Sequence, residues 1–172
     1  MKKVLVVIDM QNDFIDGSLG TEEAQRIVPE VVKKIQTFDG TVFATRDTHE
    51  ENYLETAEGK KLPVRHCIRG TEGWQIRQEI SDLLTEAPVD KVTFGSRELV
   101  KKLEQIQEET SIESITLIGL CTDICVISNA MLCKAFLPEV PVQVDASCCA
   151  GVTVESHMQA LEAMKMCQID IL

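Results

Sequence analysis

Short apolar runs rich in β-branched residues recur along the whole chain. Such runs are typical of strands that are buried on both faces. Six of them occupy residues 4–8, 41–44, 91–94, 114–118, 140–144 and 168–172. We therefore expect a six-stranded sheet with strands at these positions.

The segments between these runs carry apolar residues at helical spacing. Pro29 is expected in the first turn of one helix, where its missing N–H costs nothing, and the apolar residues at 31, 32, 35 and 38 then share a face. Strands that alternate with helices predict an α/β fold with three layers, α/β/α and Rossmann-like, around a mostly parallel sheet. The 172 residues are expected to form a single domain over 1–172. Further helices are expected within residues 76–84, 97–109, 124–137 and 154–166.

The composition is that of an ordinary globular protein, with 44% apolar and 26% charged residues. The formal net charge of −11 disfavours nonspecific binding to nucleic acid or to an anionic membrane, so we expect a small molecule or a protein as partner. The apolar run at residues 4–8 is too short for a signal-peptide core, and no run approaches a membrane span. Seven cysteines at irregular spacing indicate reduced thiols, and hence a cytoplasmic protein.

Polar residues directly follow several of the predicted strands. Asp9 ends the first run, Asp47 and His49 follow the second, and Gly119 precedes the sequence LCTDIC after the fourth. In a parallel sheet, ligands bind at the carboxyl ends of the strands, so we expect these residues to share one rim. The long irregular segment from residue 47 to residue 73 is expected to be functional.

Three cysteines fall in the sequence LCTDICVISNAMLC, in which Thr122 or Asp123 is a suitable helix N-cap. Cys125 then stands in the first turn, where unpaired N–H groups and the helix dipole lower the pKa of a thiol and favour the reactive thiolate. Cys121 lies in the turn before the helix, and Cys133 has apolar neighbours that indicate core packing. The alternative is that all three thiols are packed as small apolar side chains.

A thiolate nucleophile requires a group that accepts its proton and a cation that stabilises its charge. Asp9 and Lys91 both stand at predicted strands, where a charged side chain is costly unless it is paired. Each of them alone has an ordinary structural explanation, Asp9 as a turn cap and Lys91 as an exposed residue at the start of its strand. Together with Cys125 they form a candidate set for nucleophilic catalysis.

The motifs VVIDMQNDF, RDTH, LPVRHCIRGTEG, DKVTFGS and GLCTDICV follow one another along nearly the whole chain. In this combination the sequence resembles the isochorismatase-like cysteine hydrolases and, within them, the nicotinamidases. The resemblance implies an isochorismatase-like hydrolase fold with Asp9 as general base, Lys91 as stabilising cation and Cys125 as nucleophile. It also implies a cis peptide bond between Leu120 and Cys121, and an oxyanion hole formed by the backbone N–H groups of Cys121 and Cys125.

Nicotinamidases bind a divalent metal through a D-x-H pair and a later histidine that a cysteine follows. This pattern falls on Asp47, His49 and His66, a donor set that suits zinc, iron or manganese, with zinc expected. Candidates for a fourth ligand are Glu51, Glu55 and Glu58, of which Glu55 matches the spacing found in some relatives. On the residues alone, the two histidines also fit solvated positions in a loop, and His157 is interpreted as structural.

The resemblance further implies a small carboxamide substrate, most directly nicotinamide, which would be hydrolysed to nicotinate and ammonia through a thioester on Cys125. Phe14 would stack on the ring of this substrate. Leu62 lies in the region where nicotinamidases usually carry a tryptophan, so we expect it to line the same pocket with weaker stacking. The single tryptophan of the chain is Trp74. A homo-oligomer, either a dimer or a tetramer, is also implied.

Other functions stay open at this point. An isochorismatase acting on a vinyl ether typically lacks the metal ligands, whereas an N-carbamoyl amidohydrolase shares the nucleophile and acts on a linear ureido group. A thiol and metal sensor, or a catalytically silent scaffold, would retain the fold without the reaction. Adjacent Cys148 and Cys149 invite oxidation, although adjacent cysteines are more often packed small residues. The complete set of Asp9, Lys91 and Cys125 favours an enzyme.

Overall fold

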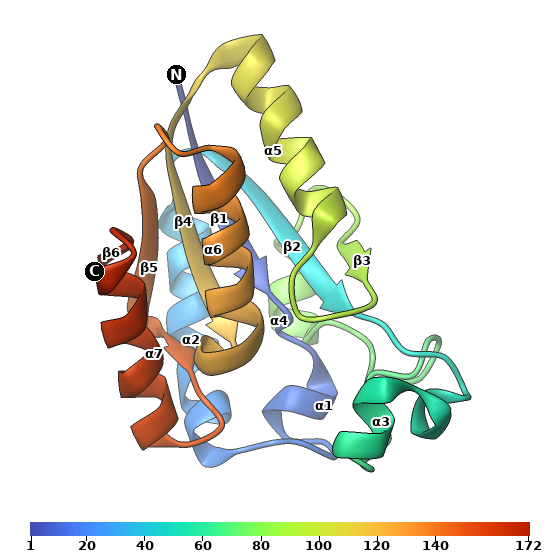
Figure 1. Cartoon of the computed structure of the whole chain (residues 1–172). Helices are drawn as coiled ribbons and strands as arrows, with labels where there is room; N and C mark the ends of the chain where they lie inside the picture. The colour runs from blue at the N-terminus through green and yellow to red at the C-terminus, as the bar shows by residue number, and fades with distance from the viewer.

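A computed structural model describes residues 1–172 and contains one six-stranded sheet. All strand pairs are parallel, and the strands run side by side in the order β3, β2, β1, β4, β5, β6 (Figure 1). The predicted fold class is therefore confirmed, with a sheet that is entirely rather than mostly parallel. The strands are β1 Lys2–Ile8, β2 Thr41–Asp47, β3 Val89–Lys91, β4 Ile112–Leu120, β5 Val142–Ala150 and β6 Asp170–Ile171.

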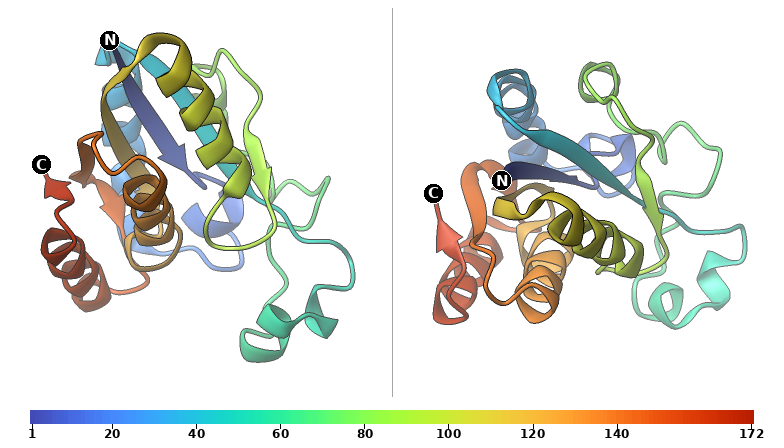
Figure 2. Two further views of the ribbon diagram at one scale, coloured as in Figure 1. Left: turned by 45° about the horizontal axis from the view of Figure 1, so that its top comes forward. Right: turned by 90° about the horizontal axis from the view of Figure 1, so that it is seen from above.

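Helices cover both faces of the sheet (Figure 2). Side chains of α5, α6 and α7 pack on one face, and those of α2 and α4 pack on the other. The short helices α1 and α3 lie beyond the carboxyl ends of the central strands (Figure 1). None of the helices combines the length and the apolar character that crossing a membrane would need. Their bounds are α1 Asn12–Ile15, α2 Glu22–Thr37, α3 Ala57–Lys61, α4 Gln78–Ser81, α5 Arg97–Thr110, α6 Ile127–Phe136 and α7 Val154–Met166, with a 3₁₀ turn η1 at Tyr53–Glu55 and a π-helical turn η2 at Thr122–Val126.

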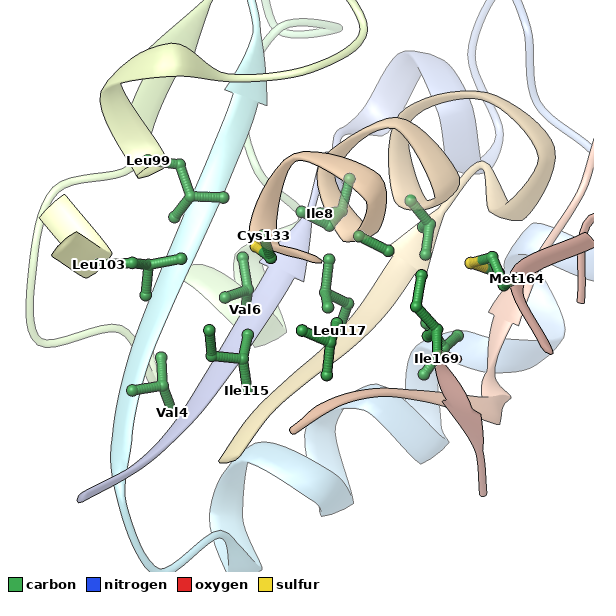
Figure 3. Packing of buried hydrophobic residues seen from close by; sticks show 14 of the residues in the cluster. Val4, Val6, Ile8, Leu99, Leu103, Ile115, Leu117, Cys133, Met164 and Ile169 are labelled. Carbon is green, nitrogen blue, oxygen red and sulfur yellow. The ribbon is translucent and has the colours of Figure 1, made fainter. Parts of the chain in front are cut away.

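The central strands are apolar on both faces because a helical layer covers each face. Val4, Val6 and Ile8 of β1 belong to the cluster drawn in Figure 3, which includes α5, α6 and α7, whereas Leu5 and Val7 pack with α2. All five side chains are fully buried. Burial of each contributes roughly 1.5–3 kcal/mol to the stability of the fold.

Several predicted elements differ from the structure in their bounds: for example, the fifth strand is Val142–Ala150 and α4 covers only Gln78–Ser81. Pro29 lies inside α2, because α2 begins at Glu22, after Thr21, whose hydroxyl accepts a hydrogen bond from the Ala24 N–H at 3.0 Å. The third strand ends at Lys91 instead of beginning there, since only Val89–Lys91 pair with β2. The helix expected over residues 124–137 is divided into η2 and α6.

The chain order reverses between β1 and β4, where parallel sheets of this type form a crevice at the carboxyl ends of the strands. Here Gly119 of β4 pairs with Ile8 of β1 and has a φ of +117°. A Cβ at position 119 would lie 2.2 Å from the Ile8 carbonyl oxygen, so only glycine allows this approach. The pairing places Asp9, which follows β1, beside Leu120 and Cys121, which follow Gly119.

Candidate active site

The side chains of Asp9, Lys91 and Cys125 meet at this crevice and are called here the Asp–Lys–Cys cluster. The Lys91 Nζ lies 2.7 Å from Asp9 Oδ2 and 3.4 Å from Cys125 Sγ. The other Asp9 oxygen, Oδ1, accepts a hydrogen bond from the Thr45 hydroxyl at 2.7 Å. All three members are buried, with 0%, 4% and 5% of their surface exposed. Residues from three distant parts of the chain therefore form one compact, charged and nearly water-free group.

The electrostatics of the cluster favour a protonated thiol in the resting protein. Burial raises the pKa of Cys125 well above its ordinary value, and the charge of Asp9 adds to this effect, which Lys91 opposes only in part. Burial also raises the pKa of Asp9, with Lys91 again opposing. The pKa of Lys91 is raised because the charges of Asp9, Cys125 and Asp47 outweigh its burial. The expectation that the helix terminus lowers the pKa of Cys125 is therefore wrong, because burial and Asp9 outweigh it.

The turn that carries Cys125 is closed by two hydrogen bonds to one carbonyl group. The N–H groups of Ile124 and Val126 donate to the Cys121 carbonyl at 3.1 and 3.0 Å. The peptide bond between Leu120 and Cys121 is cis, as the resemblance implied. Both Cys121 and Cys125 border the cavity described below, whereas Cys133 is fully buried in the core, as expected.

Asn129 anchors this turn from α6. Its Nδ2 donates to the Cys125 carbonyl at 2.8 Å and to the Phe94 carbonyl at 3.1 Å, and its Oδ1 accepts from the Ser96 N–H at 2.9 Å. The side chain is fully buried. Asn129 was not predicted from the sequence, although a lone amide within the apolar sequence VISNAML was a usable signal.

A second group, called here the carboxylate–histidine cluster, consists of Asp47, His49, Glu58 and His66. One ligand atom from each lies within 4.8 Å of the others. His49 Nε2 is 3.0 Å from Asp47 Oδ2 and 3.5 Å from Glu58 Oε1, and His66 Nε2 is 3.6 and 3.8 Å from the same two oxygens. Two imidazole nitrogens and two carboxylate oxygens thus converge on one point.

The chemistry of this donor set fits a divalent metal such as zinc, iron or manganese. His66 Nδ1 lies 2.8 Å from the Val64 carbonyl, to which it donates, so Nε2 keeps a lone pair for a metal. Asp47 connects the two clusters, because its Oδ1 lies 3.3 Å from Lys91 Nζ while Oδ2 faces the histidines. Burial opposes ionisation of Asp47, but the contacts with His49 and His66 and the charge of Lys91 hold its pKa below the ordinary value.

Glu55, the predicted fourth ligand, lies outside this cluster, and Glu58 takes the place instead. Glu55 is the last residue of the 3₁₀ turn and its side chain is exposed. Glu58 lies in the first turn of α3, which Thr56 caps by accepting from the Gly59 N–H at 3.0 Å. The 3₁₀ turn ends at Glu55 and α3 begins at Ala57, so Glu58 lies on a different helical segment, with its side chain toward the histidines. Residue spacing in the sequence does not reveal this boundary.

Gln11 fixes the backbone of Asp47 from the end of β1. Its Nε2 donates to the Asp47 carbonyl at 2.8 Å and to the Trp74 carbonyl at 2.9 Å, and its Oε1 accepts from the Asp47 N–H at 2.7 Å. Gln11 is fully buried. The residue two positions after Asp9 therefore holds the residue that connects the two clusters.

A cavity of about 220 Å³ opens between the two clusters, bordered by Cys125 on one side and by Asp47, Glu58 and His66 on the other. Phe14 and Leu62 both line it, as predicted. Phe94 also lines it and was not foreseen; an aromatic residue three positions after Lys91, in DKVTFGS, was the available signal. The remaining walls are mostly apolar.

Comparison with known proteins identifies the same family that the sequence motifs resemble. The model of the isochorismatase domain matches residues 3–172. The chain belongs to the isochorismatase family. It is 30% identical to the isochorismatase family protein PncA of Bacillus subtilis (strain 168), over 94% of this chain and 93% of that protein.

Solved structures of the family superpose over the whole chain. The zinc complex of pyrazinamidase from Pyrococcus horikoshii has a TM-score of 0.82 at 28% identity, covering 100% of this chain and 99% of that one. Nicotinamidase/pyrazinamidase PncA from Bacillus subtilis has a TM-score of 0.84 at 26% identity, covering 99% of both chains. This isochorismatase-family chain is accordingly an enzyme that hydrolyses amide bonds.

Trp74 of this family member does not border the cavity. Its Nε1 donates to the Thr48 hydroxyl at 2.9 Å, and the guanidinium carbon of Arg46 lies 3.5 Å from the ring centroid. The lining of the cavity thus includes Phe14, Phe94 and Leu62 but no tryptophan. Aromatic contacts to a ligand would come from the two phenylalanines.

Proposed function

We propose that this protein hydrolyses a small carboxamide through a thioester on Cys125, with nicotinamide as the favoured substrate and nicotinate and ammonia as products. The observation that carries the proposal is the position of one lysine ammonium group, 2.7 Å from a buried carboxylate and 3.4 Å from a buried thiol. The thiol, the carboxylate and the ammonium group together provide a nucleophile, a proton acceptor and a cation in one place.

In this mechanism Asp9 accepts the Cys125 proton as sulfur attacks the carbonyl carbon. The positive charge of Lys91 stabilises the pair while the proton is on Asp9. When the intermediate collapses, the C–N bond breaks, Asp9 gives its proton to the departing nitrogen, and ammonia leaves. Water then attacks the thioester, with Asp9 taking its proton, and the carboxylic acid and the free thiol are released. The raised pKa values of Asp9 and Cys125 support this exchange, because burial makes a second negative charge beside Lys91 costly, so the two groups share one proton.

The negative charge that develops on the carbonyl oxygen requires hydrogen-bond donors. We assign this role to the backbone N–H groups of Cys121 and Cys125, which belong to the same tight turn. Donors of this kind are each worth about 10²–10³ in rate in other acyl-transfer enzymes.

A divalent metal, with zinc as the favoured ion, would be held by Asp47, His49, Glu58 and His66. It would supply a Lewis-acid contact for a ring nitrogen of the substrate across the cavity from Cys125. Phe14 and Phe94 would contact the ring, and Leu62 would cover it. A homo-oligomer, dimer or tetramer, and a single domain in the cytoplasm complete the proposal.

The test is an ammonia-release assay over nicotinamide, pyrazinamide, a carbamoyl amino acid and an aliphatic amide. Nicotinamide and pyrazinamide should turn over fastest, chelation should reduce the rate, and Cys125→Ala should abolish it. Cys167→Ala is the matched control, since Cys167 is exposed and distant from the cavity, and it should keep the full rate. Nicotinamide turning over no faster than the aliphatic amide would contradict the substrate assignment.

The same assay separates the other functions. A preference for the carbamoyl amino acid would identify an N-carbamoyl amidohydrolase, with the same nucleophile. Turnover of none of the amides, together with equal labelling of several cysteines by a thiol reagent, would favour a thiol and metal sensor. Labelling that depends on Cys125 alone would favour the enzyme.

A further inference from the structure

We propose that His157 of α7 is a positioning residue for the turn that carries Cys125, and that it acts through the hydroxyl group of Thr122. The inference rests on the proposed role of Cys125 as nucleophile. His157 is the one histidine outside the carboxylate–histidine cluster, and neither the mechanism nor the metal ligands use it.

The contact between the two residues is short, and it joins a buried threonine to a half-buried histidine. Thr122 Oγ1 lies 2.7 Å from His157 Nδ1, and Thr122 has no exposed surface. No other hydrogen bond involves this hydroxyl group. If Nδ1 donated, the hydroxyl proton would be left in the interior without an acceptor, so the hydroxyl donates to a neutral imidazole. Burial lowers the pKa of His157, while the charge of Asp123 opposes this effect, in agreement with a neutral ring.

The next residue of the turn is tied to the same part of the molecule. Both carboxylate oxygens of Asp123 accept from the Val152 N–H, at 3.2 Å each. Gly151 allows the close approach, because a Cβ there would lie 2.9 Å from the Cβ and the backbone nitrogen of His157. The loop before α7 and the first turns of α7 therefore hold two consecutive residues of η2.

These two residues, Thr122 and Asp123, stand between Cys121 and Cys125. The backbone N–H groups of the two cysteines are the proposed oxyanion donors, and Cys125 carries the reacting sulfur. A change in the path of the chain at Thr122 would therefore alter the spacing of all three groups. Misplacements of about 0.5–1 Å are enough to reduce the rate of a positioned reaction, while Phe14, Phe94 and Leu62, which line the cavity from outside this turn, keep their positions.

The test compares His157→Leu with His157→Asn on nicotinamide. Leucine leaves the Thr122 hydroxyl buried without an acceptor, so kcat should fall about 10-fold with KM changed less than twofold. Asparagine offers an oxygen near the position of Nδ1, so kcat should stay within about threefold of the unmodified enzyme. Gln159→Leu, an exposed position on the same helix, is the control and should leave both constants unchanged.

A second pair keeps the test decisive if His157→Leu folds poorly. Thr122→Val removes the hydroxyl and keeps the shape, and it should lower kcat by a similar factor. Adding His157→Leu to Thr122→Val should then cost little more, because the interaction is already absent. The proposal is overturned if the leucine and asparagine variants lose kcat equally, or if neither His157→Leu nor Thr122→Val lowers kcat. Cys125→Ala distinguishes a failure of the proposed function from a failure of this inference. Residual turnover in Cys125→Ala would overturn the proposed function itself. An inactive Cys125→Ala protein together with fully active His157 and Thr122 variants would overturn this inference alone.

Discussion

The two charged clusters lie side by side but are built in different ways. The Asp–Lys–Cys cluster takes its members from the ends of regular elements: Asp9 follows β1, Lys91 is the last residue of β3, and Cys125 lies in the turn after β4. The carboxylate–histidine cluster takes only Asp47 from a strand; His49 and His66 come from loops between β2 and β3, and Glu58 comes from the short helix α3 in the same segment. One cluster is therefore positioned by the sheet, and the other by a loop.

This difference bears on how each cluster keeps its geometry. The register of the parallel sheet fixes the first cluster, whose members are all nearly inaccessible to water. The loop is held by separate hydrogen bonds rather than by a strand ladder, among them those from the His49 N–H to the Cys67 carbonyl at 3.0 Å and from the Cys67 N–H to Asp13 Oδ2 at 2.7 Å. A bound metal would add a further constraint to the loop but little to the Asp–Lys–Cys cluster.

The largest effect on turnover is expected from a change within the Asp–Lys–Cys cluster. Asp9→Asn keeps the size of the side chain but removes the proton acceptor, so kcat should fall about 10²–10⁴-fold while metal binding persists. Steady-state assays with metal analysis measure both quantities. Asp90→Asn makes the same chemical change next to Lys91, in a residue that pairs with Arg46 at 2.7 Å, and should change kcat less than about twofold. Comparable losses in the two variants would argue against a special role for Asp9.

The connection between the clusters can be loosened at Gln11. Gln11→Leu removes three hydrogen bonds, two of them to the backbone of Asp47, and leaves their partners buried. The free energy of unfolding should fall by roughly 3 kcal/mol, at about 1 kcal/mol for each bond. Denaturant titration measures this change, and metal affinity should weaken in parallel. Gln105→Leu on the exposed face of α5 is the control; a Gln11→Leu protein as stable as that control would disprove the bracing role.

A smaller effect is expected when the carboxylate–histidine cluster loses one ligand. Glu58→Gln should weaken zinc binding about 10- to 100-fold, because a neutral amide replaces a carboxylate beside two histidines. Glu55→Gln is an equal change in charge at the exposed position favoured by the sequence, and it should leave the affinity unchanged. Competition with a chromogenic chelator gives both constants. The reverse result would restore Glu55 as the ligand.

The contrast between a cluster positioned by the sheet and one positioned by a loop also explains which residues could be predicted from the sequence. The strands were foreseen because their apolar residues cover both faces of a sheet, and Asp9 and Cys125 because parallel strands bring their carboxyl ends to one edge. Lys91 was identified with the correct partners although its strand was displaced by a few residues. Tertiary proximity of this kind follows from topology and tolerates errors in the ends of elements.

Glu58 could not be preferred over Glu51 and Glu55 in the same way. Its direction depends on where the 3₁₀ turn ends and α3 begins, and this boundary depends on the Thr56 cap. The pKa of Cys125 was also beyond the sequence, because position at a helix terminus is local, whereas burial and the distance to Asp9 depend on the whole fold. Asn129 and Gln11 likewise acquire their importance from backbone groups far away in the chain.

The smallest effect is expected at the wall of the cavity that both clusters share. Leu62 is 40% exposed at this wall, where an indole ring would gain stacking on an aromatic substrate worth about 0.5–1.5 kcal/mol. Leu62→Trp should therefore raise kcat/KM for nicotinamide about 2- to 10-fold and leave an aliphatic amide unchanged. Leu54→Trp is the matched control, because Leu54 is 46% exposed and does not line the cavity. An equal gain for both amides would mean that residue 62 affects the conformation of the loop and does not stack on the substrate ring. Substrate selection would then depend on Phe14, Phe94 and the carboxylate–histidine cluster.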